Sequence, residues 1–152
     1  MLACLFILTA FLPYSCEEWK LPPELVGDWK SGEILITVRT QPEKRQWAFT
    51  TDSAMISITI NSDHSVTGTI GAASFTNGVI RKNRGNPDVT GCAQIIECGS
   101  IGKIFNDDPL STKEVELWLA PMEGNMIDTE LRFTEGWAQF PMAGMLLMKD
   151  ED

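Results

Sequence analysis

The sequence predicts an all-β fold, in the form of a single antiparallel meander barrel of about eight to ten short strands. Apolar and polar residues alternate over short runs, and clusters of turn-forming residues separate these runs. No stretch keeps a helical period for more than one or two turns. Loops of hairpin length favour pairing between consecutive strands, and closure into a barrel removes exposed sheet edges. A β-sandwich is the alternative architecture for the same pattern.

The first half of the chain contains the clearest hairpin. Strands are expected over residues 25–30, 34–40, 46–50, 55–60, 65–70 and 74–82. Three isoleucines share one side of 55–60, and Val66 and Ile70 share the inner side of 65–70. Residues 61–64 read Asn-Ser-Asp-His and join the two strands as a turn, because Asn, Ser and Asp hydrogen-bond to their own backbone. We therefore expect a hairpin here.

The second half of the chain continues the strand pattern. Strands are expected over residues 114–120, 126–133 and 142–148. Residues 89–105 form either two strands, 89–98 and 101–105, or one strand interrupted at Gly99 and Gly102. In 114–120 three apolar residues share one side, while Trp118 shares the other side with two glutamates. We therefore expect Trp118 to be exposed or to line a ligand surface.

The first fifteen residues are almost entirely apolar, contain no charged side chain and lead into Ser15-Cys16-Glu17-Glu18. The run is shorter than the roughly 20 residues of a transmembrane helix and is broken by Pro13, but it suits a secretory signal. A small residue before a cysteine resembles the bacterial lipobox, although Pro13 stands where that motif has Leu. We predict a signal peptide over 1–15, a lipidated Cys16 with a short tether over 16–23, and one barrel domain over 24–152. The protein would then be extracytoplasmic and membrane-anchored, in a bacterial cell envelope.

The charge of the chain excludes some partners. The formal net charge is −9, and residues 1–15 contribute nothing to it. An acidic protein is a poor partner for nucleic acid, whose affinity comes largely from Lys and Arg on phosphates. We therefore expect no nucleic-acid partner, and contact with the membrane only through the lipid anchor. The simplest explanation of the negative charge is that it keeps the domain soluble.

Two cysteines remain once Cys4 is removed with the signal and Cys16 carries lipid. They are Cys92 and Cys98, separated by Ala-Gln-Ile-Ile. In one strand their Cα atoms would lie roughly 20 Å apart, whereas a disulfide requires Cα atoms within about 7 Å. Because no turn residue lies between them, we expect two unbridged thiols, both buried.

Groups for catalysis or metal binding are scarce. His64 is the only histidine and falls in an expected turn, yet a Ser-His-Asp triad would have to use it. Ser100 lies in a Cys-Gly-Ser-Ile-Gly sequence that lacks the first Gly and the following helix of a nucleophile elbow. Asp107 and Asp108 lack calcium-loop spacing, and the cysteines lack zinc-site spacing. We predict no catalytic residue, metal or cofactor, and a protein that is not an enzyme, with an enzyme as third alternative.

The segment Leu25-Val26-Gly27-Asp28-Trp29 carries a resemblance to a known family. A Gly-x-Trp in the first strand is similar to the opening of lipocalin-like (calycin) barrels, in which the Trp plugs one end. The resemblance implies that a late basic residue packs on Trp29, and Arg132 is the candidate. Avidin-type barrels also begin this way, but nothing here supports a biotin site.

Exposed aromatic residues are the best candidates for a binding surface. Trp47, Trp118 and Trp137 are the candidates for contacts with a ligand. The expected function is a secreted, membrane-anchored, lipocalin-like protein that binds a small apolar ligand or a glycan. The alternative is a solid-core envelope interaction protein, an inhibitor or assembly factor. Whether the barrel is hollow or filled distinguishes the two.

Overall fold

The computed structural model describes residues 19–40, 48–85, 91–135 and 138–150. Their regular elements are η1 (Pro23–Leu25), β1 (Gly27–Ser31), β2 (Ile34–Thr40), β3 (Ala48–Ala54), β4 (Ile56–Ile60), β5 (Ser65–Ile70), β6 (Ala73–Lys82), β7 (Gln94–Ile101), β8 (Lys113–Pro121), β9 (Met126–Glu135) and β10 (Ala138–Lys149). η1 is one 3-10 turn with Pro23 at its start, where the missing N–H of proline costs nothing.

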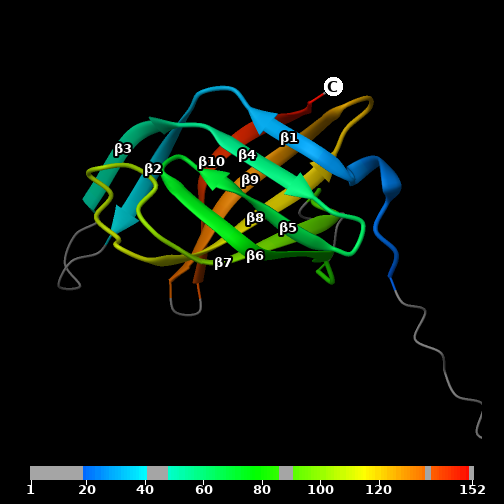
Figure 1. Cartoon of the computed structure of the whole chain (residues 1–152). Helices are drawn as coiled ribbons and strands as arrows, with labels where there is room; N and C mark the ends of the chain where they lie inside the picture. Colours follow the sequence, from blue (N-terminus) through cyan, green and yellow to red (C-terminus); the bar gives the residue numbers. More distant parts are fainter. Residues whose placement is uncertain (1–18, 41–47, 86–90, 136–137, 151–152) are drawn as a thin grey trace, which may run out of the picture.

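Eight strands close into an antiparallel barrel in the order β1-β10-β9-β8-β7-β6-β5-β4 (Figure 1). From β4 to β10 each strand pairs with the next along the chain, and β1 closes the ring between β4 and β10. The predicted all-β meander barrel is therefore confirmed, and the sandwich is excluded.

The predicted hairpin over 55–70 is present as β4 and β5. Ile56 pairs with Ile70 and Ile60 with Val66, so the apolar residues of both strands face inward. In the turn, Asp63 Oδ1 accepts hydrogen bonds from the Ser65 hydroxyl at 2.6 Å and the Ser65 N–H at 2.9 Å. These bonds lower the pKa of the Asp63 carboxyl, and they fix the turn by the chemistry that its sequence predicts.

The alternative readings of residues 89–105 are resolved in favour of one strand. β7 passes through Gly99, with a bulge between Glu97 and Gly99, and ends at Ile101. The predicted strand over 101–105 is therefore wrong. Asp108 accepts hydrogen bonds from the backbone N–H of Ile104 and of Leu110, and these contacts fold residues 102–112 into a loop.

The ends of the barrel carry different structures. η1 and the β4–β5 turn lie at one end, here called the η1 end (Figure 1). The β2–β3 hairpin leaves the barrel at the other end, here called the hairpin end. Ile36 and Val38 of β2 are fully buried, and β2 runs close to β10. At the base of the hairpin, the N–H of Ile56 donates to Ser31 Oγ at 2.8 Å.

Candidate functional site

The barrel interior is filled with apolar side chains. Each of β4 to β10 contributes at least one inward residue with no more than 1% of its surface exposed: Ile58, Val66, Ile80, Ile96, Leu117, Leu131 and Leu147. A chamber that holds even one water molecule would expose the side chains that line it. These side chains therefore leave no room between them for a ligand. The described interior has one buried side-chain oxygen without a hydrogen-bond partner, Oε1 of Gln94, and a single acceptor does not make a ligand site.

Trp29 plugs the η1 end of the barrel. Its ring is 2% exposed, and its Nε1 donates to Leu25 O at 2.8 Å. The basic residue over this ring is Lys149, whose Nζ lies 5.5 Å from the ring centroid and donates to Glu24 O. Gly27 allows this arrangement, because it has φ +130° and a Cβ at this position would lie 2.9 Å from the Lys149 stem.

Arg132 was expected on Trp29 and lies elsewhere. It projects from the outer face of β9, and its Cζ lies 4.0 Å from the ring centroid of Trp118. The correction follows from the register, because Lys149 is the direct cross-strand neighbour of Trp29 whereas Arg132 is paired with Glu116. The cation-on-tryptophan contact is present at both places, with partners that only the strand pairing determines.

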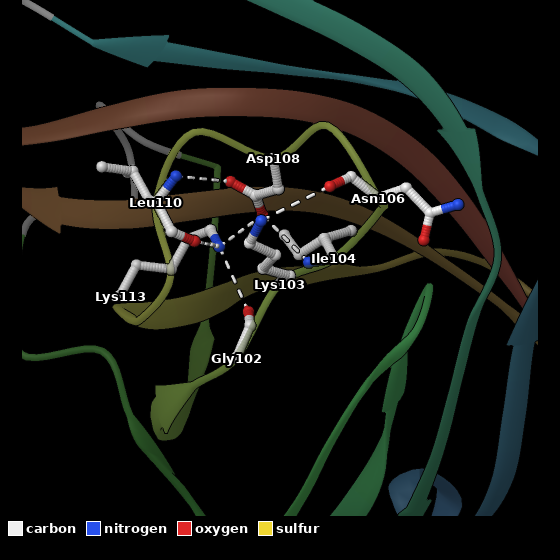
Figure 2. A network of polar contacts seen from close by, with 7 residues as sticks. All are labelled: Gly102, Lys103, Ile104, Asn106, Asp108, Leu110 and Lys113. Carbon is white, nitrogen blue, oxygen red and sulfur yellow. Dashed lines mark hydrogen bonds and ion pairs between the residues drawn. The ribbon is translucent and has the colours of Figure 1, made fainter.

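Residues 102–112 close the hairpin end around a buried ion pair (Figure 2). Lys113 Nζ lies 2.6 Å from Asp108 Oδ2, and the two side chains are 2% and 0% exposed. The ammonium also donates to the carbonyl oxygens of Gly102 and Leu110, each at 3.2 Å. All three ammonium protons thus have an acceptor. The contacts hold the loop over the barrel, and the loop's own Ile104 is buried in the hydrophobic core.

Trp118 lies on the outer face of β8, half-buried. Its Nε1 donates to Glu116 Oε2 at 2.8 Å, and Arg132 lies over its ring. Arg132 is held in turn by Glu130, with Nε 2.9 Å from Oε2. Because the guanidinium covers one face of the ring, Trp118 is part of a cross-strand network and lacks an open face there for a sugar to stack on.

Two hollows on the outer surface are lined by described residues. One, of about 370 Å³, lies between Glu97, Glu114 and Glu116 where the bulge at Gly99 leaves no side chain. The other, of about 290 Å³, lies beside Trp19, whose ring centroid is 5.2 Å from that of His64. Both are open to solvent, and neither belongs to the interior. Within the described ranges, no group of three His, Cys, Asp or Glu side chains is placed to hold a metal ion.

The remaining chemical candidates are dispersed. His64 lies in the β4–β5 turn, and Ser100 is exposed on β7 with no helix after it. Cys92 and Cys98 are both buried and unbridged, as predicted. Burial raises the pKa of both thiols, and the Glu116 carboxylate adds to the effect at Cys98. A raised pKa keeps a thiol protonated and unreactive.

The most exposed apolar residues of the described chain lie on the β2–β3 hairpin or directly after it. Leu35, Phe49 and Met55 are 69%, 62% and 60% exposed, the three highest values among the large hydrophobic residues of the described chain. Leu35 on β2 and Phe49 on β3 share the outer face of the hairpin, and Met55 follows β3 directly. We call these three residues the hairpin surface. Sequence reasoning missed it, because Leu35 shares its side of the strand with Thr37 and Arg39, and one leucine among polar residues does not indicate a contact surface.

Several predicted positions lie outside the described residues, namely Cys16, Trp47, Trp137 and the signal over 1–15. No helix in the described ranges is long and apolar enough to cross a membrane. Compared with protein families, curated proteins and solved structures, the chain gives no significant match.

Proposed function

We propose that the protein is a secreted, membrane-anchored binding module that recognises another envelope protein through the hairpin surface. The observation that carries this proposal is the contrast between the two faces of the fold. The interior side chains of the barrel are fully buried, whereas Leu35, Phe49 and Met55 are at least 60% exposed. Large apolar side chains that remain this exposed on one part of a fold are typical of interaction surfaces.

The architecture supports a lipocalin-like scaffold for this role. The barrel is closed, antiparallel and eight-stranded, and a 3-10 turn precedes its first strand. Gly27 and Trp29 form the Gly-x-Trp of that strand, and Lys149 supplies the late cation over the ring. Eight-stranded barrels either hold one small ligand or are filled by their own side chains. The buried interior favours the filled type.

The position of the hairpin agrees with a tethered module. The first described residue, Trp19, contacts His64 at the η1 end. Cys16 is three residues earlier in the sequence, so its Cα can lie no more than about 11 Å from that of Trp19, and a lipid on it would hold this end of the barrel close to the membrane. The hairpin end, opposite η1, would then face away from the membrane, where a protein partner has access to it.

The ligand that the sequence first suggested has less support. A small apolar molecule in the barrel would have to displace side chains that are packed against one another. It would also have to pass Trp29 at one end or the Asp108–Lys113 loop at the other. A glycan on Trp118 would have to displace Arg132. The interaction module requires neither rearrangement.

Photo-crosslinking in the native host tests the proposal. A benzoylphenylalanine replaces Leu35 or Phe49 on the hairpin, and in the matched controls it replaces Leu146 or Met148, which are 42% and 48% exposed on β10. We expect one discrete protein adduct from the hairpin positions and none of that mass from the β10 positions. Equal adducts from all four positions, or none from the hairpin, would contradict the proposal.

A further inference from the structure

β3 has an unpaired edge in the part of the chain that the structure describes. Every barrel strand pairs on both sides, whereas β2 and β3 pair only with each other. The second side of β2 lies close to β10, and its Ile36 and Val38 are buried. Among the described residues, the backbone–backbone hydrogen bonds of β3 all lead to β2, and one further N–H, that of Ser53, donates to the Asp52 carboxylate at 2.7 Å. Its second edge therefore presents backbone N–H and C=O groups to a partner.

We propose that this edge binds an extended, cationic peptide segment of the protein partner, which adds to the hairpin as a third, antiparallel strand. The inference rests on the proposed function and specifies how the partner is recognised. A row of alternating backbone donors and acceptors is satisfied best by another extended chain, which takes the same hydrogen bonds as a neighbouring strand would. β3 spans seven residues, enough for such a ladder.

The side chains of β3 define what the added strand has to carry. Asp52 is exposed, is the only charged residue of β3, and its described hydrogen bond is to the N–H of Ser53. Opposite charges on directly facing residues stabilise a strand pair, so a Lys or Arg belongs opposite Asp52. On the other face, an aliphatic residue directly opposite the exposed Phe49 would pack against its ring. The net charge of −9 draws a basic segment toward the protein as a whole.

A second copy of the chain fits this edge less well. The longest antiparallel overlap of β3 with itself pairs Thr51 with Thr51. That register makes the two Asp52 carboxylates diagonal neighbours on one face, about 7–8 Å apart between backbones. A charge on an edge strand is a device by which proteins avoid self-pairing. The structure therefore favours a cationic partner strand over a copy of itself.

A designed heptapeptide tests the proposal on the whole protein. In antiparallel register with β3, the peptide TTKVTIT places its lysine opposite Asp52 and its isoleucine opposite Phe49. There are two control peptides. One is TTEVTIT, and the other is TTKVTIT with N-methyl groups on the alternate backbone amides that would face β3. Titration of isotope-labelled protein by NMR should shift the amide signals of β3 and protect them from exchange. The lysine peptide should bind about fivefold more tightly than the glutamate peptide, and the N-methylated peptide should not bind.

Charge reversal gives the sharper test. Asp52→Lys should invert the preference, so that TTEVTIT binds more tightly than TTKVTIT. Asp128→Lys, on the exposed outer face of β9, changes the net charge equally and should leave the original preference in place.

The edge mode is overturned if neither peptide shifts β3, if the N-methylated peptide binds as well as the others, or if β3 shifts with protein concentration alone. Those results leave the proposed function standing when Leu35 and Phe49 still crosslink to a protein. If crosslinking from the hairpin fails as well, both are wrong.

Discussion

In the barrel, apolar side chains point inward and the outward positions are mostly polar, whereas in the β2–β3 hairpin both sides of the strands carry apolar residues. β2 buries Ile36 and Val38 completely. Leu35, on the opposite side of the same strand, is 69% exposed, and Phe49 on β3 is 62% exposed. Barrel strands are also paired on two sides and β3 on one. The barrel is therefore the closed part of the fold, and the hairpin is the part through which we propose that the protein contacts its partner.

The largest effect is expected at the closed hairpin end. Lys113→Met leaves the Asp108 carboxylate buried without its cation, and we expect a loss of about 3–5 kcal/mol of unfolding free energy. Urea denaturation measures it. Lys103→Met is the matched control, because Lys103 is exposed in the same loop and its ammonium donates to Asn106 O over a long 3.5 Å. If both variants lost the same small amount, the ion pair would not hold the loop.

Truncation of one leucine in each region tests the contrast directly. Leu131→Ala removes a fully buried side chain from the filled interior and should cost about 2–5 kcal/mol. Leu35→Ala, the same chemical change on the hairpin, should stay within about 0.5 kcal/mol of the native protein. Both values come from urea denaturation. Equal losses would mean that Leu35 supports the fold rather than a contact surface.

The buried Cys98 thiol should make the unfolding free energy depend on pH above about pH 9. Burial raises its pKa above the ordinary value of 9.0, so the folded state keeps a proton that the unfolded state loses. The thiol's contribution to stability is therefore complete below pH 9 and falls above it. Relative to Cys98→Ala, the unfolding free energy of the native protein should fall by about 1 kcal/mol from about pH 9 to about pH 10. A difference that is independent of pH would indicate a thiol reached by water.

The smallest effect is expected on the outer wall of the barrel. Arg132→Ala removes the guanidinium from the Trp118 ring, and we expect a loss of about 0.5–1 kcal/mol because the contact is partly solvated. Tryptophan emission should shift to longer wavelength as the ring becomes more exposed. Partner capture through Leu35 should be unchanged. Loss of capture in this variant would move the contact surface from the hairpin to the barrel wall.

Local patterns in the sequence predicted much of the barrel. Strand 65–70 has the predicted bounds, because its alternating residues adjoin a turn whose side chains cap their own backbone. Strand 34–40 also has the predicted bounds, and its side with Ile36 and Val38 is the buried one. The sequence did not tell which strand this side would approach, because β10 is distant in the sequence.

The contacts that close the barrel could not be predicted from local sequence patterns, because they join residues that are distant in the sequence. Lys149 lies over Trp29 because β10 pairs with β1, a register set across most of the chain. Asp108 lacks the spacing of a calcium loop, and it caps its own loop by accepting hydrogen bonds from the N–H groups of Ile104 and Leu110. Its buried partner, Lys113, begins the next strand and carries no signal of burial in the sequence.

Native mass spectrometry of the protein purified from the membranes of its own host tests the central claim most directly. We expect the polypeptide without a bound small molecule, together with a stoichiometric protein partner that is lost when Leu35 and Phe49 are both changed to serine. A small apolar molecule retained one-to-one, and unaffected by these two substitutions, would contradict the account of a filled barrel that binds on its outside.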